Sequence, residues 1–105
     1  MAHLKIDIPN EKIADFCRRH LIRKLSLFGS VLRDDFGPES DVDVLVEFEE
    51  RAKPSLFDLV RMEAELQEIL GRKVDLVDRR DVERSENYIR RRHILSSLET
   101  IYVAG

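Results

Sequence analysis

The spacing of hydrophobic and polar residues changes several times along the chain, and each change predicts a new element. A helix is expected after Asn10, a residue that favours helix N-caps, because four apolar residues follow at helical spacing: Ile13, Phe16, Cys17 and Leu21. An apolar run over residues 24–28 then predicts a strand. Gly29 provides a turn, and residues 30–35 predict a short helix.

The middle of the chain predicts a second strand and a longer helix. After a loop at residues 36–39, residues 41–48 form an apolar run that carries two acids, and residues 49–54 form a charged surface loop. Ser55, with Asp58 three residues later, resembles a capping box. The helix that follows has apolar residues on one side: Leu59, Met62, Leu66 and Ile69.

The last third predicts one more strand and one more helix. Gly71 is a favoured C-terminal helix cap, and residues 73–77 read as a strand. A final helix is expected from near Asp81 towards Leu98, and its apolar residues continue at helical spacing as candidate core: Ile94, Leu95, Leu98, Ile101 and Tyr102. Helices that alternate with strands indicate an α/β (α+β) fold, a small mixed sheet covered by helices. We expect residues 1–105 to form a single domain.

Two acids lie close together on the second predicted strand. Side chains alternate along a strand, so Asp41 and Asp43 share a face with their Cα atoms roughly 6.6 Å apart. Neighbouring carboxylates repel unless a cation lies between them. Asp75 stands among apolar neighbours on the third predicted strand, and it would join the other two acids if the strands are adjacent. Magnesium prefers such oxygen ligands, so these three acids predict a Mg²⁺ site.

A second motif, twelve residues earlier than Asp41, predicts phosphate binding. Gly29 allows backbone to approach a phosphate closely, and Ser30 would open a helix that presents free N–H groups to an anion. Arg33, one turn later, is a candidate ligand of the triphosphate. Two Mg²⁺ ions roughly 3.5–4 Å apart could clamp the attacking and leaving oxygens of a phosphoryl transfer. The carboxylates and the glycine turn together predict nucleotidyl transfer.

Structural readings of the same residues compete with this one. Gly-Ser after a strand is often an ordinary turn, and a lone Asp-x-Asp is more often two solvated or paired acids. Arg33 could equally pair with Asp34 or Asp35. The combination of both motifs at this spacing, followed by an acid on a third strand, favours the catalytic reading.

Composition excludes several classes of function. The chain has 43% hydrophobic and 37% charged residues, which is typical of a globular protein. A net charge of −3 disfavours autonomous binding of nucleic acid. Cys17 is the single cysteine, so no internal disulfide can form and a cytoplasmic protein is expected. No apolar run approaches the ~20 residues that span a membrane. The basic cluster of Arg84 and residues 90–93 is more simply a solvated helix face than an interface with RNA or an acidic partner.

At these motifs the chain resembles a known family. Gly29-Ser30, ten residues and then Asp41-x-Asp43 is similar to the signature of the DNA polymerase β-type nucleotidyltransferases. The surrounding sequence resembles the smallest branch, the minimal nucleotidyltransferases (MNT), between residues 25 and 77. The resemblance implies that Asp41, Asp43 and Asp75 bind Mg²⁺ and that Gly29 and Ser30 hold the triphosphate. Many relatives have glycine directly after the motif arginine, whereas here Asp34 follows Arg33.

The resemblance also implies a biological role. Members of the MNT branch are often antitoxins that neutralise HEPN-domain ribonuclease toxins by transferring AMP from ATP to a tyrosine. A chain of 105 residues leaves little room for a domain that holds nucleic acid, so a protein acceptor is the simpler expectation. The alternative from a different class is a binding module, an antitoxin that blocks its toxin stoichiometrically. An intact set of acids with the Gly-Ser pair favours the enzyme.

Overall fold

The computed structural model describes residues 8–29, 41–96 and 98–104. Within these ranges the strands are β1 (Ile22–Phe28), β2 (Val42–Phe48), β3 (Val74–Asp78) and β4 (Glu99–Val103). They form a mixed sheet in the order β3-β2-β1-β4, in which β2 and β3 are parallel and β1 is antiparallel to both of its neighbours. The predicted fold class is confirmed.

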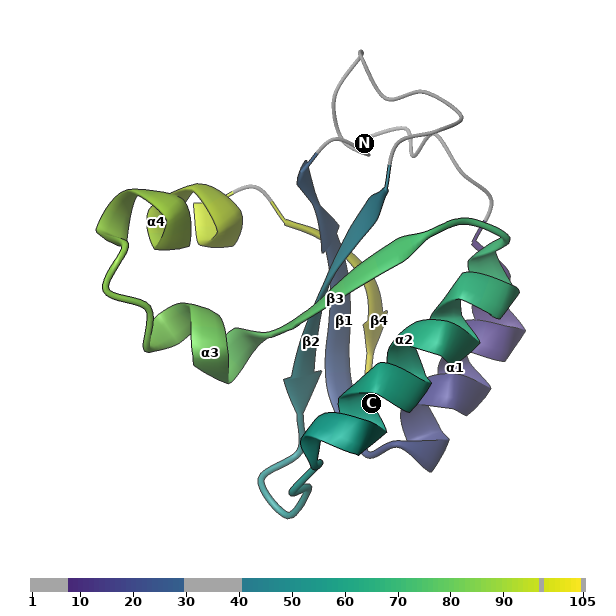
Figure 1. The fold of residues 1–105 in the computed structure, drawn as a ribbon. Helices are drawn as coiled ribbons and strands as arrows, with labels where there is room; N and C mark the ends of the chain where they lie inside the picture. Colours follow the sequence, from purple (N-terminus) through teal and green to yellow (C-terminus); the bar gives the residue numbers. More distant parts are fainter. Residues whose placement is uncertain (1–7, 30–40, 97, 105) are drawn as a thin grey trace.

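Two pairs of helices lie on opposite sides of this sheet (Figure 1). On one side are α1 (Asn10–Arg19) and α2 (Leu56–Leu70), and on the other are α3 (Arg79–Glu83) and α4 (Tyr88–Ser96). α2 is the crossover that parallel strands require, because it connects the end of β2 to the start of β3. Both faces of the sheet are therefore at least partly covered.

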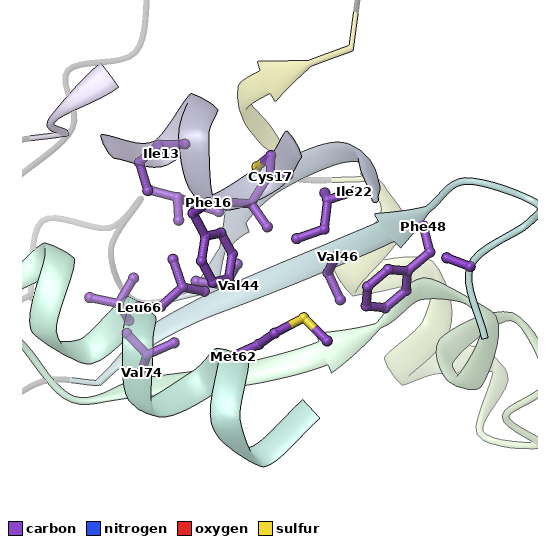
Figure 2. Close-up of a cluster of buried hydrophobic side chains, with 14 residues drawn as sticks. Ile13, Phe16, Cys17, Ile22, Val44, Val46, Phe48, Met62, Leu66 and Val74 are labelled. Carbon is purple, nitrogen blue, oxygen red and sulfur yellow. The ribbon is translucent and has the colours of Figure 1, made fainter. Parts of the chain in front are cut away.

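The larger core lies between the sheet and the first helix pair (Figure 2). Alternate residues of β2 point into it, namely Val42, Val44, Val46 and Phe48, all at most 8% exposed. α1 contributes Ile13, Phe16 and Cys17, and α2 contributes Met62 and Leu66. The predicted apolar stripes of both helices are thus the core-facing stripes. Burial raises the pKa of the Cys17 thiol to about 12, so this cysteine is a neutral packing residue at physiological pH.

α2 has the two ends that the sequence predicts. The hydroxyl of Ser55 accepts a hydrogen bond from the backbone N–H of Asp58 at 3.2 Å, and the carboxylate of Asp58 accepts one from the Ser55 N–H at 2.8 Å. This reciprocal pair is the capping box. Gly71 closes the helix at φ 66°, in the left-handed region that suits glycine.

Several predicted boundaries differ from the structure, and β3 covers Val74–Asp78 instead of residues 73–77. β1 begins at Ile22, two residues before the predicted strand, and β2 begins one residue after Asp41. The prediction that Asn10 caps α1 is wrong, because Pro9 holds the N-cap position and makes no side-chain capping hydrogen bond. The short helix expected at residues 30–35 and the loop at 36–39 lie outside the described residues.

The C-terminal prediction of one helix is wrong. α3 begins at Arg79 because the Asp78 carboxylate accepts the backbone N–H of Arg80 at 2.9 Å and caps the helix. The Ser85 hydroxyl accepts the N–H of Asn87 at 3.2 Å, a local hydrogen bond that competes with helix continuation.

The end of the chain also differs, since Ile101 and Tyr102 lie in β4 and not in a helix. Residues 100–103 are Thr, Ile, Tyr and Val, which are β-branched or aromatic and favour a strand. β4 pairs antiparallel with the otherwise open edge of β1, where Leu25 faces Tyr102.

Loss of the α2 cap should destabilise the fold by a predictable amount. Ser55→Ala removes the hydroxyl that accepts the Asp58 N–H, so we expect the free energy of unfolding to fall by ~1 kcal/mol in urea titrations followed by circular dichroism. Ser55→Asp is the control, because aspartate is an equally good N-cap and should retain most of that stability. Equal losses in both variants would contradict this role of the side chain.

Candidate active site

The site is built on the face of β2 that points away from the larger core. Val42 and Val44 are fully buried on the core face, so Asp43 between them points to the opposite face. Its neighbour across the sheet on one side is Phe28 of β1, and on the other side it is Asp75 of β3. The second and third strands are adjacent, which the sequence left as a condition, and their pairing brings Asp43 and Asp75 into register.

This register places the two carboxylates on neighbouring strands, and the strand backbones of a sheet lie ~4.8 Å apart. Asp43 is half-buried and Asp75 is exposed, while Asp41 is exposed and lies just before β2 begins. Within residues 8–29, 41–96 and 98–104, no three Asp, Glu, His or Cys side chains gather closely enough to hold a metal ion. The structure therefore pairs Asp43 with Asp75, and the convergence of all three acids stays a prediction.

The Asp43 carboxylate also lies close to Gly29 and leaves no space for a side chain there. Its backbone has φ 76°, and a Cβ added there would lie 2.2 Å from Oδ2 and 3.1 Å from Cγ of Asp43. Only glycine avoids both the strained φ and this overlap. The predicted turn at Gly29 is confirmed, and the structure adds that Gly29 and Asp43 are in close approach. Ser30 and Arg33 lie outside the described residues, so their roles stay predictions.

β3 is fixed in place by side chains of α2. The backbone N–H of Val74 donates to Oε1 of Gln67 at 3.2 Å, and that of Leu76 donates to Oε2 of Glu63 at 3.0 Å. These two amides flank Asp75 in the sequence. The strand that carries Asp75 is thus held on one side by β2 and on the other by α2.

A salt-bridge network holds α3 against the sheet. Arg79 contacts Glu83 at 2.7 Å and Glu47 of β2 at 3.1 Å. The hydrogen bond to Glu83 raises the pKa of Arg79, and Glu47 adds to the effect. Glu47 lies four residues after Asp43 on β2 and on the same face, so this network fixes α3 at a set distance from the acids.

A second apolar cluster lies beside the acids, and it includes Ile94, Leu95 and Leu98, which the sequence predicts as core. The sequence did not predict that this cluster lies next to the acids. Phe28 and Leu45 of the sheet pack with Val82 of α3 and Ile94 of α4, each at most 9% exposed. Val77, Leu95 and Leu98 complete the cluster. The signal was present in β3, where Val77 is two residues from Asp75 and shares its face, but the partner residues come from helices whose boundaries the sequence did not reveal.

The arrangement has the elements of a phosphoryl-transfer site. Paired carboxylates attract a hard divalent cation, and a glycine turn next to them leaves room for a phosphate. The carboxylates and Gly29 are held by the paired strands β1, β2 and β3 or directly beside them. Such a site positions a nucleotide and stabilises charge as a bond to phosphorus changes.

Comparison with known proteins also indicates a phosphoryl-transfer enzyme, specifically a nucleotidyltransferase. Residues 10–99 match the nucleotidyltransferase domain family. A Methanocaldococcus jannaschii protein assigned by name to the protein adenylyltransferases is 40% identical over 74 residues, which cover 70% of this chain and 77% of that protein. A solved structure assigned by name to a minimal nucleotidyltransferase is 32% identical, with a TM-score of 0.65 and coverage of 86% of each chain.

A more distant solved structure shares the fold. It is the complex of a tri-AMPylated Shewanella oneidensis HEPN toxin with an MNT antitoxin, at 21% identity and a TM-score of 0.60, and the match covers 90% of this chain and 70% of that one. The family match and the fold define a nucleotidyltransferase. The chain belongs to the nucleotidyltransferase domain family, in its minimal branch, and this confirms the resemblance drawn from the motifs.

None of the helices described here has the length and apolar character needed to cross a bilayer.

Gly29 and Gly71 form a matched pair for a test of the site. Both have positive φ, but a Cβ at Gly71 meets nothing within 4 Å, whereas one at Gly29 meets Asp43. We expect Gly29→Ala and Gly71→Ala each to lose ~1–2 kcal/mol of stability from backbone strain. Only Gly29→Ala should also displace the Asp43 carboxylate and reduce nucleotidyl transfer, by about a hundredfold.

The measurements are urea unfolding and the rate of AMP transfer, made on both variants. Similar transfer rates in the two variants would show that the Gly29–Asp43 approach has no catalytic importance.

Proposed function

We propose that this protein is a Mg²⁺-dependent adenylyltransferase antitoxin that moves AMP from ATP to a tyrosine of a HEPN toxin. The observation that carries this proposal is the register of Asp43 with Asp75, together with the close approach of Gly29 to Asp43. A pair of carboxylates beside a glycine turn is the donor set that MgATP requires. The relatives named as protein adenylyltransferases and the fold match to an MNT antitoxin with its AMPylated toxin support the choice of acceptor.

The acids suit a divalent ion on physical grounds. Asp43 and Asp75 stand in register on one face, an arrangement that a cation stabilises against repulsion. In the proposed site Asp41, Asp43 and Asp75 hold Mg²⁺, and the bound ion supplies charge stabilisation at the α-phosphate and at the departing pyrophosphate. Gly29, Ser30 and Arg33 bind the triphosphate.

The proposed reaction is a displacement at the α-phosphorus of ATP. The tyrosine oxygen forms a bond to this phosphorus, and the bond to the oxygen that bridges to the β-phosphate breaks. The products are O-adenylyl tyrosine and pyrophosphate, and the phenol proton passes to the Asp75 carboxylate. In-line attack requires the phenol oxygen within about 3–3.5 Å of the phosphorus, so the target tyrosine must lie in a protruding segment of the toxin.

The acceptor is proposed to be a protein because of charge. With a net charge of −3 the chain has little electrostatic attraction for a polynucleotide. Arg84 of the basic cluster already pairs with Asp81, and Arg79 nearby pairs with Glu83. A protein partner that brings its own binding surface fits this charge balance better.

The second candidate is a stoichiometric antitoxin that inhibits by binding alone. Exposed apolar side chains favour a role in binding, since Leu56, Phe57 and Val60 on α2 are at least 61% exposed. In this case the carboxylates are not needed for inhibition.

Transfer to the partner can be tested directly. We expect that incubation of the purified protein with Mg²⁺, ATP and the HEPN protein encoded beside it will add whole adenylyl masses to that protein. Tandem mass spectrometry should map them to tyrosine. The double variant Asp41→Asn, Asp43→Asn should add none, because the oxygen ligands of the ion are lost.

The same double variant separates the two candidates. Inhibition of the ribonuclease is measured with wild type and with the double variant at matched concentrations. If the variant inhibits as well as wild type, the stoichiometric antitoxin is correct and transfer is a side activity.

Ligand binding should be visible as a gain in stability. A ligand that binds only the folded state at a hundred times its Kd adds ~2.7 kcal/mol, so saturating MgATP should raise the melting temperature by several degrees. Asp43→Asn should remove this shift and leave the ligand-free stability equal or slightly higher, because the repulsion with Asp75 is relieved. Asp15→Asn, an acid on the exposed surface of α1, is the matched control and should keep the shift. A full MgATP shift in Asp43→Asn would remove Asp43 from the metal site.

A further inference from the structure

A pocket of about 130 Å³ lies between β3, α3 and α4. Its lining combines apolar side chains with three polar or charged ones: Val77, Val82, Ile94, Asp81, Ser85 and Arg91. The pocket borders the second apolar cluster, because Val77, Val82 and Ile94 belong to both. Val82 and Ile94 are each 6% exposed.

The pocket is next to the acids. Val77 follows Asp75 by two residues on β3, so the two side chains share a face with their Cα atoms roughly 6.6 Å apart. Across the sheet, Val77 is in register with Leu45, which is two residues after Asp43. An aromatic ring in the pocket would therefore lie beside the carboxylate pair, shifted by two residues along β2 and β3.

Its size and lining select a small, partly apolar group. An apolar cavity of ~150 Å³ is large enough to bind benzene, whereas sites for whole small-molecule ligands have about 300–1,000 Å³. The pocket can thus hold one ring but not a complete nucleotide. The apolar walls suit the faces of an aromatic ring, and the charged rim suits a polar atom at its edge.

The direction of attack decides which ring enters. The leaving pyrophosphate would lie at Gly29, at the end of β1, and the nucleophile must approach from the opposite side of the α-phosphorus. The strand order β1-β2-β3 puts β3 on that opposite side. The pocket is walled by Val77 of β3 and by α3 and α4, and no residue of β1 lines it. It is on the acceptor side of the site.

Arg91 is held at the rim in a fixed position. Its Nη1 donates to the backbone carbonyls of Glu83 at 3.2 Å and Ser85 at 3.4 Å, and its guanidinium lies 5.5 Å from the ring centroid of Tyr88. A guanidinium close to a phenol stabilises the phenolate, which is the better nucleophile.

We propose that this pocket binds the phenol ring of the acceptor tyrosine and aims its oxygen at the carboxylate pair. The inference rests on the proposed adenylyl transfer to tyrosine and assigns its acceptor subsite. In the reaction the phenol oxygen bonds to the α-phosphorus, its proton goes to Asp75, and pyrophosphate leaves towards Gly29. Arg91 orients the phenol and is not itself changed.

The first test blocks the pocket. Ser85→Trp places an indole at a lining position, and Ser96→Trp makes the same change at an exposed position of α4 outside the pocket. For Ser85→Trp we expect kcat/KM for the acceptor protein to fall by about tenfold or more, with the Kd of MgATP within about twofold of wild type. Ser96→Trp should match wild type in both measurements, and circular dichroism verifies the fold of each variant.

The second test measures binding to the wild-type protein without transfer. N-acetyl-tyrosinamide is titrated in the presence of Mg²⁺ and a non-hydrolysable ATP analogue, and methyl NMR shifts are recorded. We expect shifts at Val77, Val82 and Ile94 but not at Val60, which is exposed on α2. Adenosine, titrated alone, should leave the same methyl groups unshifted.

The outcomes distinguish a failure of the proposed tyrosine subsite from a failure of the proposed adenylyl transfer. Loss of MgATP affinity in Ser85→Trp, or adenosine shifts at the pocket methyl groups, would assign the pocket to the base and overturn the proposal. Absence of N-acetyl-tyrosinamide shifts would also overturn it, whether or not wild type transfers AMP. Tyrosinamide binding in a protein that never modifies its partner would keep the aromatic pocket and reject the proposed function.

Discussion

The alternation of side chains along β2 is the constraint on which the rest of the structure depends. Val42, Val44 and Val46 are each fully buried under α1 and α2, and this fixes which way every residue between them points. A shift of one residue would bury Asp43 in the larger core at a high desolvation cost and expose three valines. Burial of the valines on one face of β2 thus determines that the Asp43 carboxylate points to the other face.

The pairing of β2 with its neighbours turns this single orientation into a site. β1 ends beside Asp43, so the chain must turn at Gly29 where the carboxylate leaves no room for a side chain. β3 runs parallel because α2 returns the chain to the same end of the sheet, and this brings Asp75 level with Asp43. One row further along, Leu45 and Val77 begin an apolar surface that α3 and α4 cover. Charged and apolar rows therefore lie side by side on one face of the sheet.

Much of this could be predicted from local sequence. The acids of β2 and β3, the capping box of α2 and the cap at Gly71 are each set by a few neighbouring residues, and short-range rules find them. The adjacency of β2 and β3 was left open by the sequence, although the helix between them is the crossover that a parallel pair requires.

The C-terminal part could not be predicted in this way. Ile101 and Tyr102 fit a helical spacing when counted from Ile94, and also suit a strand by residue type. What decides between these is the open edge of β1, more than seventy residues earlier, with which β4 pairs. The pocket beside Val77 was missed for the same reason, because it exists only where α3 and α4 fold back over the sheet. Distant pairing is invisible to periodicity within one segment.

The hydrogen bonds from Val74 and Leu76 to α2 have a consequence for how a partner can dock. β3 is an edge strand, and its outward amides are the groups to which a foreign strand would normally add. Gln67 and Glu63 already accept both of these amides, so this edge is closed to extension of the sheet by another chain. A partner protein therefore cannot bind by adding one of its own strands to β3, the strand that carries Asp75. Strand addition is a common way to bind peptides, and it depends little on their sequence. A partner must instead approach the acids over the face of the sheet, where side chains and not backbone decide what is accepted.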